Sequence, residues 1–221
     1  MQYIFFKLLV FMVIPLFNLL ASNKVVVFDF GGVLTKETDR QTVVNFFCDT
    51  FNLSEEEFLK INKERRQLDP DSADYIKFWE SYAKRNTISL PKGWQLVFLS
   101  VYKRSVCINQ DMFALVDRLK QKKIKVGLLS NIDINHARLL KHIGYYKPFD
   151  PCLLSCEMGI EKPNPKAFQI LINHLRIPAK DIIFIDDNSN NVKSATDLGI
   201  DAILFQSKDQ LEKELSKRQL L

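Results

Sequence analysis

The stretch Lys24–Thr35, KVVVFDFGGVLT, decides the fold. Three valines and Phe28 follow one another without alternating polar residues, which is typical of a strand buried on both faces in the middle of a parallel sheet. The run ends on Asp29, at the strand end where open α/β sheets place their ligands. Gly31 and Gly32 then allow a sharp turn and a close approach of the backbone to a ligand. The alternative interpretation is an ordinary strand ended by a turn, with Asp29 in solvent.

Three later stretches also place polar side chains at a strand end or in a loop. Their sequences are KVGLLSN (Lys125–Asn131), EKPNP (Glu161–Pro165) and IIFIDDNSNN (Ile182–Asn191). They contribute a hydroxyl and an amide, a lysine before a helix, and paired carboxylates: Ser130 and Asn131, Lys162, and Asp186 and Asp187. The order of acid, hydroxyl, lysine and acid pair resembles the four motifs of the haloacid dehalogenase (HAD) superfamily, and the resemblance covers the chain from about Lys24 onward.

The pattern along the rest of the chain predicts an α/β fold with one insertion. From Asn109 onward, helical and strand-like segments alternate, which favours a doubly wound, Rossmann-like parallel sheet with helices on both faces. Between the first two strands, apolar residues recur at helical spacing with no strand among them. We therefore expect residues 23–35 and 106–221 to form the core and residues 36–105 an all-helical cap. In the family that this chain resembles, such a cap covers the active site and helps to select the substrate.

Several helix ends can also be predicted from capping residues. Ser54 is the expected N-cap of a second cap helix, and Asp71 or Ser72 is expected to open the third. Pro91 is expected to open the fourth. Asn164, followed by a proline, is the expected N-cap of a helix in the core. The aromatic residues of the cap helices are expected to pack in its interior.

The first 22 residues have the layout of a secretory signal peptide. Residues 1–22 carry a single charge, Lys7, then an apolar run, and end on Ala21 and Ser22. This pattern predicts export to the periplasm or the outside of the cell, with membrane contact only during export. The alternative is an additional helix packed on a cytoplasmic domain. The four cysteines would permit disulfides in an exported chain, but no pairing is predicted.

The composition excludes some classes of partner. The chain has 221 residues, of which 47% are hydrophobic, so it can bury a substantial core. Lysine and arginine exceed aspartate and glutamate by only 31 to 26, and no basic stripe with interleaved aromatic residues is present. We therefore expect no nucleic-acid partner. His136, His142 and His174 lack the spacing of metal ligands and are expected to pack or to lie on the surface.

The resemblance implies a particular chemistry for the four motifs. Asp29 would be the nucleophile, since a carboxylate can attack a phosphoryl group and carry it as an aspartyl phosphate. Mg²⁺ would neutralise the repulsion between this anion and the substrate. Its ligands would be Asp29, Asp187 and the carbonyl group of Gly31, with Asp186 acting through water or as a neighbour that supports the ligands without binding the ion. The function implied is that of a Mg²⁺-dependent phosphatase for a small phosphorylated substrate.

The remaining motif residues would bind the substrate. Ser130 and Lys162 would hold the oxygens of the transferring phosphoryl group. Gly32 and Asn131 are also expected to contact the substrate.

Two positions depart from the pattern of most phosphatases of the superfamily. Gly31 stands where they carry an aspartate that protonates the leaving group, and Asn191 stands where many carry an acid. The α-D-glucose-1-phosphate phosphatase-like branch also has glycine at the first position, and the chain is similar to that branch. Two alternatives stay open: a non-catalytic descendant that binds a phosphorylated ligand or a protein, and a dehalogenase-type hydrolase that uses the same aspartate.

Overall fold

The computed structural model describes residues 24–36, 39–68 and 74–221 of the chain. The predicted signal peptide, residues 1–22, lies outside the described residues, and so do Asp71 and Ser72. Within the described ranges, no helix is both long and apolar enough to cross a lipid bilayer.

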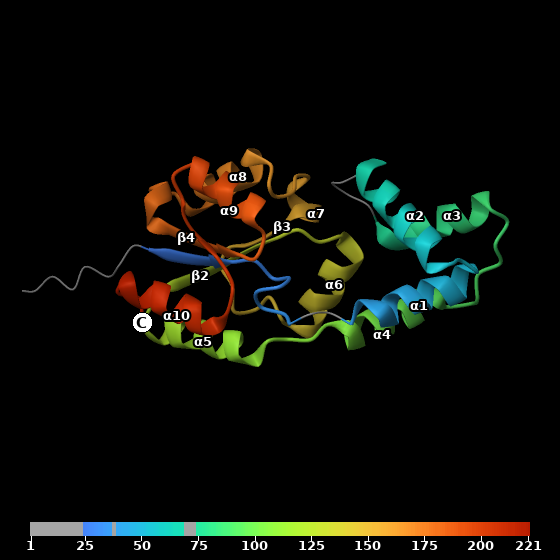
Figure 1. The fold of residues 1–221 in the computed structure, drawn as a ribbon, viewed down its shortest axis with the longest axis horizontal. Coiled ribbons are helices and arrows are strands. Elements are labelled where there is room, and N and C mark those ends of the chain that lie inside the picture. Colours follow the sequence, from blue (N-terminus) through green and yellow to red (C-terminus); the bar gives the residue numbers. More distant parts are fainter. Residues whose placement is uncertain (1–23, 37–38, 69–73) are drawn as a thin grey trace, which may run out of the picture.

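The described part of the α/β core contains one five-stranded sheet in the order β3-β2-β1-β4-β5 (Figure 1). The strands are β1 (Val25–Phe28), β2 (Lys125–Ser130), β3 (Cys152–Leu154), β4 (Ile182–Asp186) and β5 (Asp201–Leu204). All neighbouring strands are parallel. The predicted doubly wound sheet is confirmed, and β1 occupies its centre, between β2 and β4.

Helices cover both faces of this sheet. They are α5 (Gln110–Gln121), α6 (Ile134–Ile143), α7 (Ser155–Met158), α8 (Pro165–Leu175), the 3₁₀ helix Ala179–Asp181, α9 (Ser189–Asp197) and α10 (Lys208–Lys217). Apolar residues of α5, α6 and α10 pack with Val26 and Phe28 of β1, whereas those of α8 and α9 pack with Val25 and Val27. Because successive side chains of a strand point to opposite faces, both sets are buried, which explains the unbroken apolar run in the sequence.

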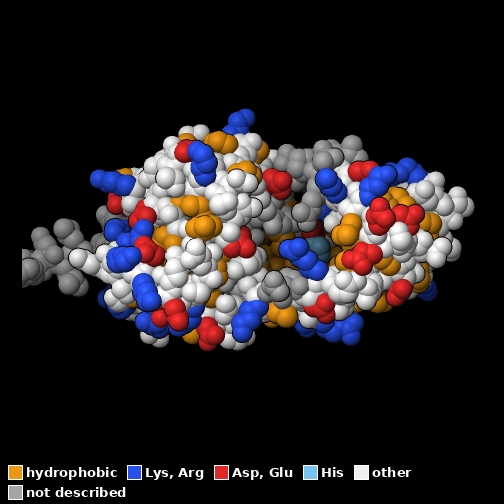
Figure 2. All heavy atoms as spheres, in the orientation of Figure 1, with side chains coloured by type: hydrophobic (Ala, Val, Ile, Leu, Met, Phe, Trp, Pro, Cys, Tyr) orange, Lys and Arg blue, Asp and Glu red, His pale blue; other side chains and the backbone are white. Residues whose placement is uncertain are grey.

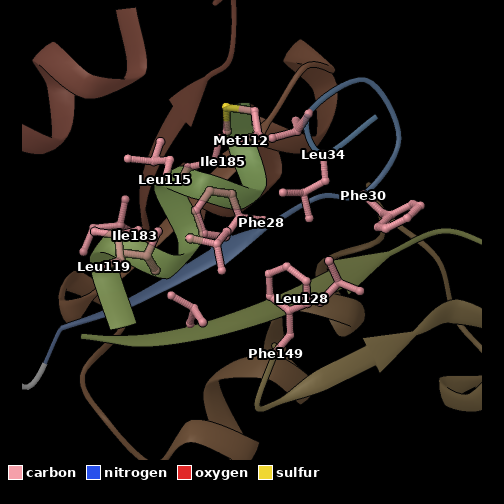
Figure 3. Close-up of a cluster of buried hydrophobic side chains, with 14 of the residues drawn as sticks. Phe28, Phe30, Leu34, Met112, Leu115, Leu119, Leu128, Phe149, Ile183 and Ile185 are labelled. Carbon is pink, nitrogen blue, oxygen red and sulfur yellow. The ribbon is translucent and has the colours of Figure 1, made fainter. Parts of the chain in front are cut away.

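Figure 3 shows the larger of these two clusters. Three side chains of α5, Met112, Leu115 and Leu119, lie against Phe28 of the central strand. Ile185 and other residues of the neighbouring strands complete the layer. This packing fixes β1 and therefore the position of the loop that follows it.

The helical part consists, among the described residues, of α1 (Arg40–Phe51), α2 (Glu55–Leu68), α3 (Tyr75–Arg85) and α4 (Trp94–Ser105), and it lies to one side of the sheet (Figure 1). Its interior is aromatic. The ring of Phe47 has its centroid 4.7 Å from that of Trp79 and 5.2 Å from those of Phe58 and Phe98. These rings form a cluster separate from the two that flank the sheet.

The two chain segments that lead into and out of the helical part run side by side. Thr35 forms an isolated antiparallel bridge with Ile108, and the amide of Lys36 donates a hydrogen bond to the carbonyl of Cys107 at 2.8 Å. The connection between the two parts is therefore a short pair of backbone segments that starts within a few residues of Asp29.

The helix ends show where capping residues predict the structure correctly. Ser54 and Glu57 form a capping box, and the Asn164 side chain accepts from the amide of Lys166. Two predicted starts are wrong. The third helix begins at Tyr75, because Asp74 caps it by accepting from Lys77. The fourth begins at Trp94, because a turn precedes it and Gly93 adopts a φ of 77°. The short helix α7 was not predicted.

Candidate active site

Three carboxylates meet at the carboxyl end of the two central strands. Asp29 follows β1, Asp186 is the last residue of β4, and Asp187 comes next. Each offers an oxygen that lies within 4.8 Å of an oxygen of the other two. The amide of Asp29 donates to the carbonyl of Ile185 at 2.8 Å, which ties the end of one strand to the other. The pairing of β1 with β4 therefore brings together acids that are far apart in the sequence.

Lys162 is the cation of this cluster. Its Nζ lies 2.9 Å from Oδ1 of Asp29 and 2.7 Å from Oδ2 of Asp186, and its side chain is 1% exposed. The ammonium also lies 5.2 Å from the centroid of the Phe184 ring. If all three acids were ionised, the cluster with its one ammonium would carry a net charge of minus two. A divalent cation would balance it.

The electrostatics of the site favour an additional positive charge. Burial raises the pKa of Asp29 to about 6, although the neighbouring Lys162 ammonium lowers it and the Asp186 carboxylate raises it further. Burial and the Asp186 carboxylate also raise the pKa of Asp187. Both acids therefore resist ionisation in the protein alone. A cation bound between them would reverse this tendency.

Gly32 makes room for the Asp187 carboxylate. A Cβ atom built on Gly32 would lie 2.0 Å from Oδ2 of Asp187, and the residue has a φ of +72°. Only glycine fits both conditions without displacing the acid. The Gly32 amide donates to Oγ1 of Thr35 at 3.2 Å, and the predicted contact of Gly32 with the substrate stays a prediction. At Gly31, in contrast, an added Cβ would meet nothing within 4 Å.

Ser130 and Asn131 lie at the end of β2, next to β1. Ser130 is buried. The Asn131 side chain exchanges two hydrogen bonds with the backbone of Lys162: Nδ2 donates to its carbonyl at 2.7 Å, and Oδ1 accepts from its amide at 2.9 Å. Asn131 thus fixes the loop that carries the lysine, and its predicted contact with a substrate stays a prediction.

Two side-chain contacts of residues that the sequence analysis named, Asn191 and His136, could not be predicted. Asn191 donates to both oxygens of Asp186, at 3.1 and 3.0 Å, a contact that the sequence gives no means of finding. Asp133 caps α6, and its carboxylate contacts Nδ1 of the His136 ring. The His136 ring packs against Tyr102 of α4, with 3.6 Å between ring centroids, so this histidine lies where the core meets the helical part.

Comparison with known proteins identifies the family. A family model for haloacid dehalogenase-like hydrolases matches residues 23–199. The chain belongs to this family.

The four cysteines of this HAD-like hydrolase are free. Its surface is hollowed between the α/β core and the helical part, and charged side chains of both signs are interspersed on the face that Figure 2 shows.

Curated relatives match parts of this HAD-like hydrolase. The drimenol cyclase drtB of Aspergillus calidoustus is 35% identical over 118 residues, which are 52% of this chain and 22% of that protein. The glyceraldehyde 3-phosphate phosphatase of Methanothermobacter thermautotrophicus is 32% identical over 95 residues, 42% of each chain. The chain spans less than half of the length of either relative.

Solved structures share the whole fold. One is a HAD family enzyme from Bacteroides thetaiotaomicron in complex with magnesium and inorganic phosphate. It superimposes with a TM-score of 0.66 at 24% sequence identity, covering 85% of this chain and 98% of that one. The likeness therefore extends over both the α/β core and the helical part.

Proposed function

We propose that this protein is a Mg²⁺-dependent phosphatase that hydrolyses a small phosphate monoester through an aspartyl phosphate. One observation carries the proposal: the carboxylate of Asp29 lies beside a buried lysine, within a cluster of three acids and one ammonium. Such a cluster suits a divalent cation placed next to a nucleophilic carboxylate.

The chemistry of the donors fits Mg²⁺. Asp29 and Asp187 would hold it through carboxylate oxygens and Gly31 through its carbonyl group, while Asp186 supports the site through its contact with Lys162. Hard oxygen donors of this kind are the ligands that Mg²⁺ prefers. Among the described residues, the hydrogen bond that reaches the Asp187 carboxylate comes from its own backbone amide, and the residue is exposed, so its oxygens are accessible to an ion. When bound, the ion supplies positive charge that lowers the repulsion between nucleophile and phosphate.

In the proposed first step, an oxygen of Asp29 attacks the phosphorus atom. A new oxygen–phosphorus bond forms while the bond between phosphorus and the leaving oxygen breaks, and the leaving group takes the electron pair. Lys162 and Ser130 hold the phosphoryl oxygens. In the second step, the oxygen of a water molecule bonds to the phosphorus atom while the bond between phosphorus and the Asp29 oxygen breaks. The electron pair returns to the Asp29 carboxylate, the water gives up a proton to solvent, and inorganic phosphate leaves. Position 31 offers no acid for the leaving group, since it is glycine.

The relatives support this proposal. One curated relative is a phosphatase of a three-carbon phosphate ester, and a protein with the same fold is known in complex with magnesium and inorganic phosphate. We further propose that residues 36–105 act as a cap that selects the substrate over the hollow between the two parts. The glycine at position 31 supports a substrate like those of the glucose-1-phosphate phosphatase-like branch.

A comparison of two substrates tests the proposal against its rivals. The purified protein is incubated with p-nitrophenyl phosphate, with and without Mg²⁺, and separately with a 2-chloro carboxylic acid. The phosphatase proposal predicts Mg²⁺-dependent release of nitrophenol that is absent in Asp29→Asn. Release of chloride without metal would support the dehalogenase. No turnover of either substrate would support a non-catalytic binding protein.

A further inference from the structure

The amide of Asn191 faces the carboxylate of Asp186. Asn191 lies in the first turn of α9 and is 6% exposed, and Asp186 is fully buried. Nδ2 of Asn191 lies 3.1 Å from Oδ1 and 3.0 Å from Oδ2 of Asp186. The opposite orientation of the amide would place its oxygen against two carboxylate oxygens, so the donor orientation is the one that chemistry allows. The amide therefore holds the plane of the carboxylate.

Every acceptor position of Asp186 is in use. An ionised carboxylate offers about four lone-pair positions. Oδ1 accepts from the amide of Asn188 at 2.8 Å and from Asn191, while Oδ2 accepts from Lys162 at 2.7 Å and from Asn191. The neighbouring Asp187 differs, since its side chain is exposed. Of the two adjacent acids, Asp187 therefore has oxygens available to bind a cation, whereas those of Asp186 are already hydrogen-bonded.

Asp186 in turn determines where the Lys162 ammonium points. Its Oδ2 and the Oδ1 of Asp29 are the two carboxylate oxygens that the structure places within 3 Å of Nζ. The backbone of Lys162 is fixed independently by Asn131. With the backbone held, the direction of the side chain depends on the carboxylate that receives it, and that carboxylate depends on Asn191.

We propose that Asn191 is a positioning residue that holds Asp186 as the counter-ion of Lys162, which leaves Asp29 and Asp187 as the carboxylate ligands of the divalent cation. The inference rests on the proposed function for the presence of the cation and the phosphoryl group. Without the amide, the Asp186 carboxylate can rotate, and Lys162 loses its alignment towards the phosphoryl oxygens. Phosphate binding then weakens, whereas cation binding does not.

Two binding measurements separate these effects without any turnover. Isothermal titration calorimetry gives the Kd of Mg²⁺ for the full chain, and then the Kd of inorganic phosphate at saturating Mg²⁺. The test variant is Asn191→Leu, which keeps the volume and removes the donor. The matched control is Asn190→Leu, which makes the same change at the preceding, exposed residue of the helix. Asp187→Asn provides the reference for a lost cation ligand.

The expected result is a split between the two constants. In Asn191→Leu, phosphate binding weakens about tenfold or more, the effect of losing one well-aligned charge-assisted contact. The Mg²⁺ Kd of this variant stays within about twofold of that of the parent, whereas Asp187→Asn weakens Mg²⁺ binding about tenfold or more, because a carboxylate ligand is lost. Asn190→Leu leaves both constants unchanged.

Two results would overturn the inference. If Asn191→Leu weakened Mg²⁺ binding as much as Asp187→Asn does, the amide would act on the cation and its waters. If Asn191→Leu left phosphate binding unchanged, Asn191 would serve only to fill space beside Asp186 and would not position Lys162. Should Asn191→Leu fail to unfold cooperatively, Asn191→Ala is measured in its place and judged by the same two results, because it removes the donor without adding bulk or charge beside Asp186.

The failure of the proposed function is distinguishable from the failure of this inference. A parent protein that binds Mg²⁺ and phosphate but hydrolyses no ester would refute the phosphatase, while the two binding constants would still decide the role of Asn191. A parent that binds neither Mg²⁺ nor phosphate would overturn both.

Discussion

Replacing Gly31 by aspartate should supply the acid that this site lacks. The structure removes the two usual objections to such a change. A Cβ at Gly31 would meet nothing within 4 Å, and Gly31 is not among the glycines with positive φ. The loss of glycine's freedom in the unfolded chain contributes about 0.4–1 kcal/mol of stability, which offsets part of the repulsion from a further carboxylate. We expect the free energy of unfolding to change by less than about 1 kcal/mol.

The catalytic gain should depend on the leaving group. General acid catalysis typically contributes about 10²–10⁴-fold, or about 3–5 kcal/mol of barrier. Esters of alcohols need this help, whereas phenolates leave without it. In the parent protein, aryl phosphates should therefore react far faster than alkyl phosphates. In Gly31→Asp, the rates for alkyl phosphates should rise by up to about 10²-fold, while those for aryl phosphates change little. The gain is expected at the lower end of the range because no surrounding side chains hold the new carboxyl in its best orientation.

The assay is a series of phosphate esters of graded leaving-group pKa, measured at saturating Mg²⁺ on both proteins. Its matched control is Gly32→Ala at the adjacent glycine. That Cβ would lie 2.0 Å from Oδ2 of Asp187 at a φ of +72°, so stability should fall by about 1–3 kcal/mol and activity should be lost. Equal rates for aryl and alkyl esters in the parent would refute the reasoning, because another residue would then be donating the proton.

Three further expectations concern the acids and the N-terminal segment. Asp29→Asn should abolish turnover. Above pH 6 it should also stabilise the metal-free protein by up to about 3 kcal/mol. The reason is that burial raises the pKa of the Asp29 carboxyl from 3.8 to about 6, so its ionised form opposes folding. That gain should disappear as the pH falls below 4, where both the folded and the unfolded protein hold the proton; thermal unfolding across this range checks it, and a gain independent of pH would contradict it. Asp187→Asn should raise the Mg²⁺ concentration needed for half-maximal activity about tenfold or more, which a metal titration measures; an unchanged requirement would exclude Asp187 as a ligand. If residues 1–22 are a signal peptide, mass spectrometry of the protein from its native host should find an N-terminus near Asn23, whereas an intact Met1 on protein in the cytoplasm would exclude it.

The sequence predicts the meeting of Asp29 and Asp186 because geometry leaves little choice. Asp29 follows an apolar run and Asp186 ends one, and neither run alternates with polar residues as a half-exposed strand would. Both runs are therefore expected to be buried parallel strands, whose carboxyl ends meet at the same edge of the sheet. The same reasoning brings Ser130 to the neighbouring strand end. These positions depend on the two-residue repeat of side-chain direction along a strand and on the parallel direction of the strands, and both can be inferred from the sequence.

The contacts within the site could not be predicted in this way. Asn131 and Lys162 are joined by two hydrogen bonds across 31 residues, and the side chain of Asn191 donates to Asp186. Side-chain amides bond equally well to many groups, so only the packed structure decides which they meet. The start of the third helix failed for a related reason: aspartate and serine are both common N-caps, so residue type alone did not single out Asp74, which caps α3.

The separate aromatic interior of α1–α4 has a consequence for how the molecule opens. Phe47 and Trp79 belong to a cluster that includes no residue of the sheet, and Tyr102 is one of the side chains that pack against both this cluster and the larger one beside the sheet. Two such bodies can lose their structure at different free energies, as independent cooperative units. Amide hydrogen exchange should then show α1–α4 exchanging together as one group, at a rate unrelated to that of β1 and β4. Substitutions that adapt the helical part to another substrate would therefore cost little of the stability on which the carboxylates depend.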